Sequence, residues 1–281
     1  MSKRYLSRRK FLTTVTAGAG TLLLGRSLMA MPLVSSGLAA ETLPIVRLGK
    51  TGLKTTLLGM GTGFSGYNRT SSITRAGVAE PMIRQAYQKG IRFFDCADLY
   101  GTHEFTHDAL KGYDRDSYLL ATKIWVDPGG IPEAERPDAN IVVERFRKEL
   151  KTDYLDLVQI HCMTDAKWTD TQKKQMDLLE NLKAKKIIRA HGVSVHSLDA
   201  MDHKDPARVT PVIEKLHKAG KGVIGMKLIG NGNFKDQSDK IDESLRFVLK
   251  LGTVDMIIVG FETPGQIDDY IGRIGRVLKN S

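Results

Sequence analysis

Four polar residues stand at, or just beyond, the ends of apolar strand-like segments. Asp95, Lys123 and His161 each end such a segment, and Tyr100 follows Asp95 by five residues, in the next loop. In a parallel barrel, side chains at the carboxyl ends of several strands together form the reactive site. An acid, a phenol, an amine and an imidazole suggest proton transfer coupled to stabilisation of negative charge on oxygen.

Strand-like and helical patterns alternate along the chain that must position these residues. A Gly-Lys-Thr-Gly turn within LPIVRLGKTGLKTTLLG predicts an N-terminal β-hairpin. Helical stripes separate the strands, as in 81–89, which stops at Gly90, and 209–216, with Val209, Val212, Ile213 and Leu216. We predict that these stripes face the core. The strand-like segments are 57–61, 91–95, 119–123, 155–161, 187–194, 222–227 and 255–260.

Repeated strand–helix units of about 30 residues predict a parallel α/β architecture. A doubly wound dinucleotide-binding fold, the other common parallel α/β architecture, is the alternative that we disfavour. We therefore predict a TIM-type (β/α)8 barrel preceded by the hairpin. A closed barrel needs eight strands, and the chain offers seven. Because Gly222 follows Ser194 by only 28 residues, room for a single crossover, we expect one strand–helix unit to be lacking.

The N-terminal segment has the pattern of an export signal. Ser7-Arg8-Arg9-Lys10-Phe11-Leu12 precedes a weakly apolar stretch, and small residues at 37–40 offer a cleavage site. We expect a twin-arginine signal peptide over 1–40, a barrel domain over 41–281, and a periplasmic or otherwise exported protein that contacts the twin-arginine machinery. A signal anchor is disfavoured by Arg26 and several Gly and Thr residues, so we expect no stable membrane span. A disordered cytoplasmic tail is the alternative.

The charge of the chain outside this segment excludes one class of partner. The whole chain carries 42 Lys and Arg against 32 Asp and Glu, a net charge of +10. Residues 1–40 contain six of the basic residues and no acidic one, which leaves 36 against 32, a net charge of +4. This small excess, without a basic segment interleaved with aromatics, argues against nucleic-acid binding.

We expect neither a disulfide cross-link nor a metal centre. Cys96 and Cys162 lie on the second and fourth strand-like segments. If those strands flank a third, the cysteines are about 10 Å apart, too far for a disulfide, so we expect free thiols. His103 and His107 have HxxxH spacing, but we expect no metal site.

Taken in order, these motifs resemble the aldo/keto reductase family over nearly all of 44–281. The resemblance implies hydride transfer between a nicotinamide nucleotide and a small-molecule carbonyl substrate, an aldehyde or ketone. Tyr100 would be the general acid, and the Lys123 ammonium, held by Asp95, would draw the pKa of the phenol down. His161 would donate a hydrogen bond to the substrate oxygen. The matching segments are RLGKTGLKTTLLGMGTG, GIRFFDCADLYGTHE, LLATKIW, LKTDYLDLVQIH, GVSVHS, GVIGMKLIGNG and VDMIIVGFETPGQIDD.

The resemblance also implies contacts to NADP(H). Ser194 matches a contact to the carboxamide, but the Asn expected beside it is Val195. Glu262 stands where many members place a basic residue for the 2′-phosphate, so NAD(H) is a second possibility. The implied cofactor-binding residues are Gly61, Thr62, Gly63, Ser194, Lys227, Gly230, Gly232, Gln266 and Asp269.

The chain departs from the family pattern after HSLDA, where about one strand–helix unit is absent. The family's sixth strand gives the nicotinamide a polar side chain, and its loss leaves two unpaired strand edges. Three hypotheses follow: an active oxidoreductase, a catalytically weak nicotinamide-binding or redox-sensing module on the same fold, and a damaged product of an internal deletion. We expect a monomer.

Substrate specificity is expected in three loops, 64–79, 126–137 and 162–170. These loops and their borders contain Phe64, Tyr67, Trp125 and Trp168. The rings suggest an apolar or aromatic carbonyl substrate, although packing at the surface would explain them equally well.

Overall fold

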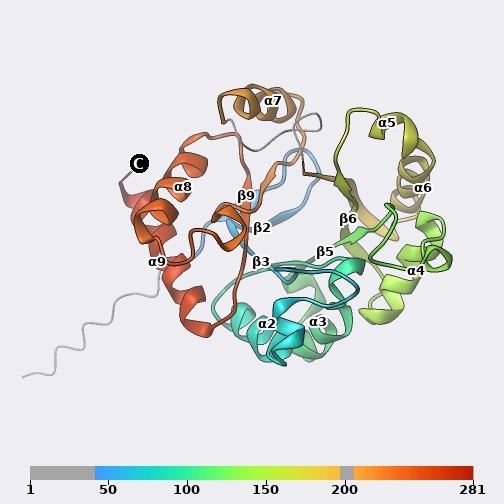
Figure 1. The fold of residues 1–281 in the computed structure, drawn as a ribbon, viewed down its shortest axis with the longest axis horizontal. Coiled ribbons are helices and arrows are strands. Elements are labelled where there is room, and N and C mark those ends of the chain that lie inside the picture. Colours follow the sequence, from blue (N-terminus) through green and yellow to red (C-terminus); the bar gives the residue numbers. More distant parts are fainter. Residues whose placement is uncertain (1–41, 197–205, 281) are drawn as a thin grey trace, which may run out of the picture. The chain divides into compact units, whose positions relative to one another are not determined.

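The computed structural model describes residues 42–196 and 206–280, and its centre is a curled parallel sheet of seven strands (Figure 1). The strand order is β7-β6-β5-β4-β3-β9-β8, and every neighbouring pair is parallel. This confirms the predicted barrel-type α/β fold with seven core strands. The strands are β3 (Leu58–Gly61), β4 (Phe93–Asp95), β5 (Leu119–Ile124), β6 (Leu155–Met163), β7 (Ile188–Val195), β8 (Ile224–Gly225) and β9 (Met256–Gly260).

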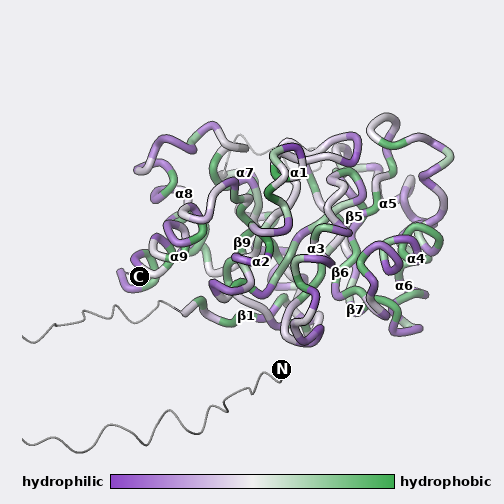
Figure 2. The backbone as a smooth tube through the Cα atoms, turned by 90° about the horizontal axis from the view of Figure 1, so that it is seen from below, coloured by the Kyte–Doolittle hydropathy of each residue, from purple (hydrophilic) through white to green (hydrophobic). Residues whose placement is uncertain are grey.

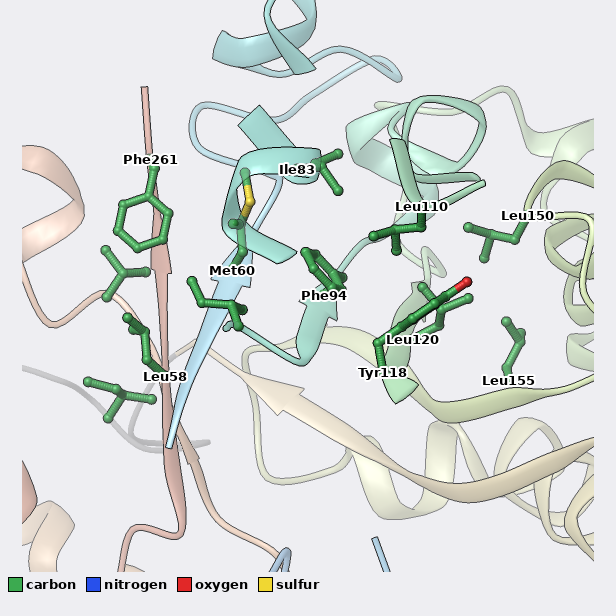
Figure 3. Close-up of a cluster of buried hydrophobic side chains, with 14 of the residues drawn as sticks. Leu58, Met60, Ile83, Phe94, Leu110, Tyr118, Leu120, Leu150, Leu155 and Phe261 are labelled. Carbon is green, nitrogen blue, oxygen red and sulfur yellow. The ribbon is translucent and has the colours of Figure 1, made fainter. Parts of the chain in front are cut away.

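The strands are buried on both faces because the sheet lies between two apolar clusters. Alternation along β5 illustrates this: Leu119 and Ala121 belong to the inner cluster, whereas Leu120 and Ile124 pack outward under the helices. Figure 3 shows part of the outer cluster, in which Phe94 and Leu120 lie near one another between sheet and helices. The same alternation puts Lys123 on the inner face.

The predicted hairpin is present and covers the amino end of the sheet. β1 (Ile45–Arg47) and β2 (Lys54–Thr56) pair antiparallel, and Leu48 and Leu53 enter the inner cluster. At the turn, Gly49 has φ +47°, and a Cβ there would lie 2.5 Å from the backbone of Gly222. The hairpin is therefore fixed against the segment that leads into β8.

Amphipathic helices form the outer layer, as predicted. Ile241, Leu245 and Val248 are buried on one of them, and Met82, Ile83 and Ala86 on another. Figure 2 shows hydrophobic and hydrophilic stretches alternating along these helices, as one buried face requires. The helices are α1 (Ser72–Arg75), α2 (Ala79–Gln88), α3 (His103–Leu110), α4 (Ala139–Glu149), α5 (Trp168–Thr171), α6 (Lys173–Ala184), α7 (Pro206–Lys218), α8 (Ser238–Lys250) and α9 (Pro264–Lys279).

The prediction that the apolar stripe of α7 faces the core is wrong. Val212 and Leu216 are 38% and 39% exposed. Neither they nor Val209 and Ile213 belong to either buried cluster of the described residues. α7 lies in the outer ring between α5 and α8 (Figure 1), but β8, the strand that follows it, has only two residues. Little sheet is therefore available for α7 to cover.

The two edges of the sheet are the strands on either side of the predicted deletion. β7 and β8 do not pair with each other among the described residues, which confirms the expected edges. The signal peptide predicted for 1–40 and most of the segment at the deletion, 197–205, lie outside the described residues. Within 42–196 and 206–280, every helix is too short or too polar to cross a membrane.

Candidate active site

Three of the four polar residues share the inner face of the sheet at its carboxyl edge. Asp95 follows Phe93 by two residues, and His161 follows Leu157 by four, so both keep the inward register of those apolar residues. Lys123 reaches Asp95 across the β4–β5 pair: its Nζ lies 2.6 Å from both carboxylate oxygens and 3.0 Å from the carbonyl oxygen of Cys96. All three side chains are buried.

Tyr100 completes the group from the 3-10 turn Asp98–Tyr100 that follows β4. Its hydroxyl lies 3.3 Å from His161 Nε2, and Lys123 Nζ lies 5.0 Å from the centre of its ring. The turn ends at Gly101 with φ +61°, where a Cβ would lie 1.8 Å from the carbonyl oxygen of Arg69. The structure thus brings all four predicted residues into one cluster.

Two glycines create the space for the phenol ring. A Cβ on Gly63 would lie 2.2 Å from the ring of Tyr100, and one on Gly66 would lie 2.5 Å from it. Gly63 was predicted as a cofactor contact, and the structure gives it a separate steric role. Gly66 was missed, although its position in the same glycine-containing loop was visible in the sequence.

The ion pair between Lys123 and Asp95 keeps the Lys123 ammonium charged inside the protein. Burial by itself lowers the pKa of Lys123, but the Asp95 carboxylate and the Tyr100 phenol together raise this pKa above its ordinary value. Lys123 is therefore an ammonium at neutral pH, directly below the phenol ring.

The expected lowering of the Tyr100 pKa is wrong for the protein alone. Burial raises the pKa of this phenol above 10, and the opposing effect of Lys123 is smaller. Tyr100 is therefore fully protonated at neutral pH. This is the form that can donate a proton.

His161 is neutral at pH 7 because its surroundings disfavour the protonated imidazole. Burial, followed by the charges of Lys123, His196 and Lys227, lowers its pKa well below 6.5. Its Nδ1 is buried without a hydrogen-bond partner among the described residues. Its Nε2 faces the hydroxyl of Tyr100, so the imidazole is placed to donate or accept one hydrogen bond at the same point as the phenol.

An open cleft extends from this cluster toward the start of α9. Tyr100 and Asp95 line one part of it, and Glu262 and Gln266 line another. Five of the predicted cofactor-binding residues line the cleft: Gly61, Gly63, Lys227, Gly232 and Gln266.

The other four predicted contacts lie outside the cleft lining, and three are engaged with protein groups. Thr62 donates to the carbonyl oxygen of Asp95 at 2.9 Å, and the Ser194 hydroxyl accepts from the backbone N–H of Cys162 at 2.9 Å. Asp269 accepts from Arg273 on the same helix, α9. Gly230 is in the 3-10 turn Gly230–Gly232 with φ +58°. Their cofactor roles stay predictions.

An ionic network around Asp98 was missed by sequence reasoning. This carboxylate is 3% exposed and accepts hydrogen bonds from both terminal nitrogens of Arg145 and from Nε of Arg69. Arg69 also forms an ion pair with Glu135. The network thus links the turn that carries Tyr100 to two of the predicted specificity loops. The only available signal was the second Asp of FDCADLYG.

The four aromatic residues predicted near the mouth divide into different roles. Phe64 lines the cleft. Trp125 stacks edge-on to His161 with ring centres 5.4 Å apart, and its Nε1 donates to the carbonyl oxygen of Gly129. Tyr67 is 50% exposed, and Trp168 packs against the outer cluster. Cys96 and Cys162 are both free thiols.

Comparisons with known proteins agree with this fold and indicate its family. The sequence model of the Aldo/keto reductase family matches residues 57–215. An aldo-keto reductase YhdN of Bacillus subtilis is 32% identical over 162 residues, covering 54% of this chain and 47% of the relative. D-arabinose 1-dehydrogenase of Saccharomyces cerevisiae is 31% identical over 129 residues, covering 43% and 37%. The chain thus spans about half the length or less of these curated relatives.

Solved structures share the fold at lower identity. A putative aldo-keto reductase from Pseudomonas aeruginosa has a TM-score of 0.69 at 24% identity, covering 85% of this chain and 97% of that one. An aldo-keto reductase from Klebsiella pneumoniae, solved in complex with NADPH, has a TM-score of 0.62 at 16% identity, covering 83% and 90%. The matched family segment includes all of Asp95, Tyr100, Lys123 and His161. The chain belongs to the aldo/keto reductase family.

Proposed function

We propose that this protein is an NAD(P)(H)-dependent oxidoreductase that interconverts an aldehyde or ketone and its alcohol. The observation that carries the proposal is the meeting of a protonated phenol, a neutral imidazole and a buried ammonium beside an open cleft. Membership of the aldo/keto reductase family supports the same reaction type.

The cleft residues fit a nicotinamide dinucleotide at its phosphate-bearing part. Lys235 brings a cation to this part of the lining, and Gly232, in the 3-10 turn Gly230–Gly232, lines the cleft without a side chain. When bound, the nucleotide would give a hydride to the carbonyl carbon or take one from the alcohol. Glu262 in the lining disfavours an added 2′-phosphate, so we propose that NADH is accepted as well as NADPH.

The side chains divide the proton chemistry among them. Tyr100 donates its hydroxyl proton to the carbonyl oxygen during reduction, and His161 donates a hydrogen bond from Nε2 to the same oxygen. Lys123 stabilises the phenolate that remains, and Asp95 holds Lys123 in place and charged. The phenol is then reprotonated from solvent.

The first test compares wild-type protein with the Tyr100→Phe variant. We expect wild type to oxidise NADPH or NADH in the presence of 4-nitrobenzaldehyde, and Tyr100→Phe to lose about 100-fold or more of this rate. Because the ring is retained, nucleotide binding measured by fluorescence should change little. Equal rates in both proteins would contradict the role of Tyr100.

A second candidate is a catalytically weak nicotinamide-binding or redox-sensing module. Two observations favour it: the β7 and β8 edges do not pair among the described residues, and Ser194 accepts a hydrogen bond from Cys162. Saturable nucleotide binding by wild type without turnover of any carbonyl compound would support this candidate over the enzyme.

We further propose that the protein is a monomer exported through the twin-arginine machinery. Arg8 and Arg9 in the SRRKFL pattern support this location. Replacement of both by Lys should retain the protein in the cytoplasm in cell fractionation. Because this route carries folded proteins, the nucleotide would be loaded before export, and slow nucleotide release on dialysis is expected.

A further inference from the structure

A second cation lies at the carbonyl end of the cleft rather than at its phosphate end. Lys227, just beyond β8, adopts a left-handed backbone conformation with φ +59° and lines the cleft together with Tyr100. Its Nζ lies 3.5 Å from Nδ1 of His196. Within residues 42–196 and 206–280, no carboxylate forms an ion pair with this ammonium.

A row of rings connects Lys227 to the reacting centre. The ring of His196 lies 6.1 Å from that of His161, and the ring of His161 lies 5.4 Å from that of Tyr100, each edge to face. Successive side-chain contacts therefore connect an exposed cation with the proton donor, in the order Lys227, His196, His161 and Tyr100. After burial, Lys123, His196 and Lys227 each lower the pKa of His161.

Lys235 provides a cation for the nucleotide independently of Lys227. It lines the same cleft three residues beyond Gly232, and among the described residues it forms no ion pair. The two lysines are thus distinguishable: the side chain of Lys227 contacts His196, whereas Lys235 follows the glycine turn.

From this arrangement we propose that Lys227, with His196, binds a carboxylate on the substrate. The substrate class would then be an aldehyde or ketone that carries a carboxylate, with its carbonyl oxygen between Tyr100 and His161. This inference rests on the proposed function and narrows it. It adds one negative charge to the apolar or aromatic carbonyl compound that the rings of the loops suggest.

One opposing charge lies close to the same place and offers a control. Cys162 follows His161 in the chain, and burial is the main cause that raises the pKa of its thiol. Asp127 raises this pKa further, whereas Lys227 lowers it. Asp127 also repels Asp165, and Arg136 partly offsets this. Removing the charge of Asp127 should therefore favour an anionic substrate, whereas removing that of Lys227 should disfavour it.

The test measures kcat/KM for 4-carboxybenzaldehyde and for its uncharged methyl ester, methyl 4-formylbenzoate. Wild type should prefer the carboxylate, and Lys227→Met should reduce the ratio of the two values by roughly three- to tenfold. Lys227→Arg should retain most of the ratio. Asp127→Asn should increase it. Lys235→Met, the matched control, should raise the KM for the nucleotide and leave the ratio unchanged.

The outcomes separate the inference from the proposed function. If Lys227→Met raises the nucleotide KM and does not alter the ratio, Lys227 binds the cofactor and the inference is overturned. If wild type reduces neither aldehyde, the proposed function fails. The carboxylate site is then tested by the binding of a charged alcohol and its uncharged ester, without any turnover. Trp125 lies beside His161, so its fluorescence in a Trp168→Phe background should be quenched by 4-(hydroxymethyl)benzoate and much less by its methyl ester. Equal quenching by both would overturn the carboxylate site.

Discussion

The Lys123 ammonium lies 2.6 Å from both carboxylate oxygens of Asp95, and neither side chain is more than 5% exposed. The two residues come from neighbouring strands, β5 and β4. A buried ion pair of this kind contributes little net stability when intact, because desolvation offsets the attraction, but it is strongly destabilising when one partner is removed. Replacing one residue of this pair should therefore destabilise the fold as well as disturb the reacting centre.

Removal of one partner should destabilise the protein more than removal of both. Lys123→Met leaves the Asp95 carboxylate buried and uncompensated, and we expect a loss of about 3–5 kcal/mol in the free energy of unfolding. The double variant with Asp95→Asn should recover a large part of this loss. Urea unfolding of the two single variants and the double variant measures the coupling. If the double variant loses the sum of what the two single variants lose in the free energy of unfolding, Lys123 and Asp95 do not act as a pair.

The pH dependence of reduction should follow Tyr100 and not His161. The reaction needs the protonated phenol, so activity is present below the pKa of Tyr100 and is lost above it. Because burial raises this pKa above its ordinary value of about 10, kcat/KM for an uncharged aldehyde should stay level from pH 7 to about 9. Because the pKa of His161 is far below 6.5, no inflection is expected near that value. A clear fall between pH 7 and 9 would contradict these directions.

His161 should make the folded state sensitive to acid. The unfolded chain binds a proton at this residue near pH 6.5, whereas the folded chain does so only at much lower pH. The stability contributed by neutral His161 is therefore full above pH 6.5 and is lost as the pH falls through its lowered pKa. At pH 5.5 the loss should be about 1 kcal/mol. Urea unfolding of wild type and His161→Gln at pH 7.5 and 5.5 tests this, since the variant lacks this component.

Asp98 should position Tyr100 without touching the substrate. Its carboxylate is held by Arg145 and Arg69, and its own turn ends at Tyr100. Asp98→Asn should lower kcat by about tenfold or more, because small displacements of a reacting group are costly, and should leave the nucleotide KM unchanged. Arg145→Lys, which retains the charge, should recover part of the rate. A raised nucleotide KM with normal kcat would point to another role.

The exposed stripe of α7 should tolerate truncation of its apolar side chains. Leu216 on α7 is 39% exposed, whereas Leu245 on α8 is fully buried. Leu216→Ala should change the free energy of unfolding by about 0.5 kcal/mol or less, and Leu245→Ala should reduce it by about 2–5 kcal/mol. A cooperative transition in both would also exclude a damaged, poorly folded chain. Large losses for Leu216→Ala would show that α7 is packed in solution.

The sequence alone was enough to identify the strands, the hairpin and the four residues of the reacting centre. Strands of a parallel barrel are apolar along their length, so a polar residue that ends one of them is conspicuous. Period-two alternation then decides which face it occupies. Asp95, Lys123 and His161 were predictable for this reason, and the shortage of one strand followed from the short distance between Ser194 and Gly222.

Other features depend on contacts between residues far apart in the chain, which no local pattern contains. The spacing of Val212 and Leu216 indicates an apolar face, but only the packing of the sheet decides whether a partner covers it. The proximity of Gly63 to the Tyr100 ring depends on how two loops meet. The pKa of Tyr100 likewise depends on total burial, which outweighs the single charge of Lys123 that the sequence could name. The tertiary structure therefore decides the protonation states, and with them the direction in which the site can act at neutral pH.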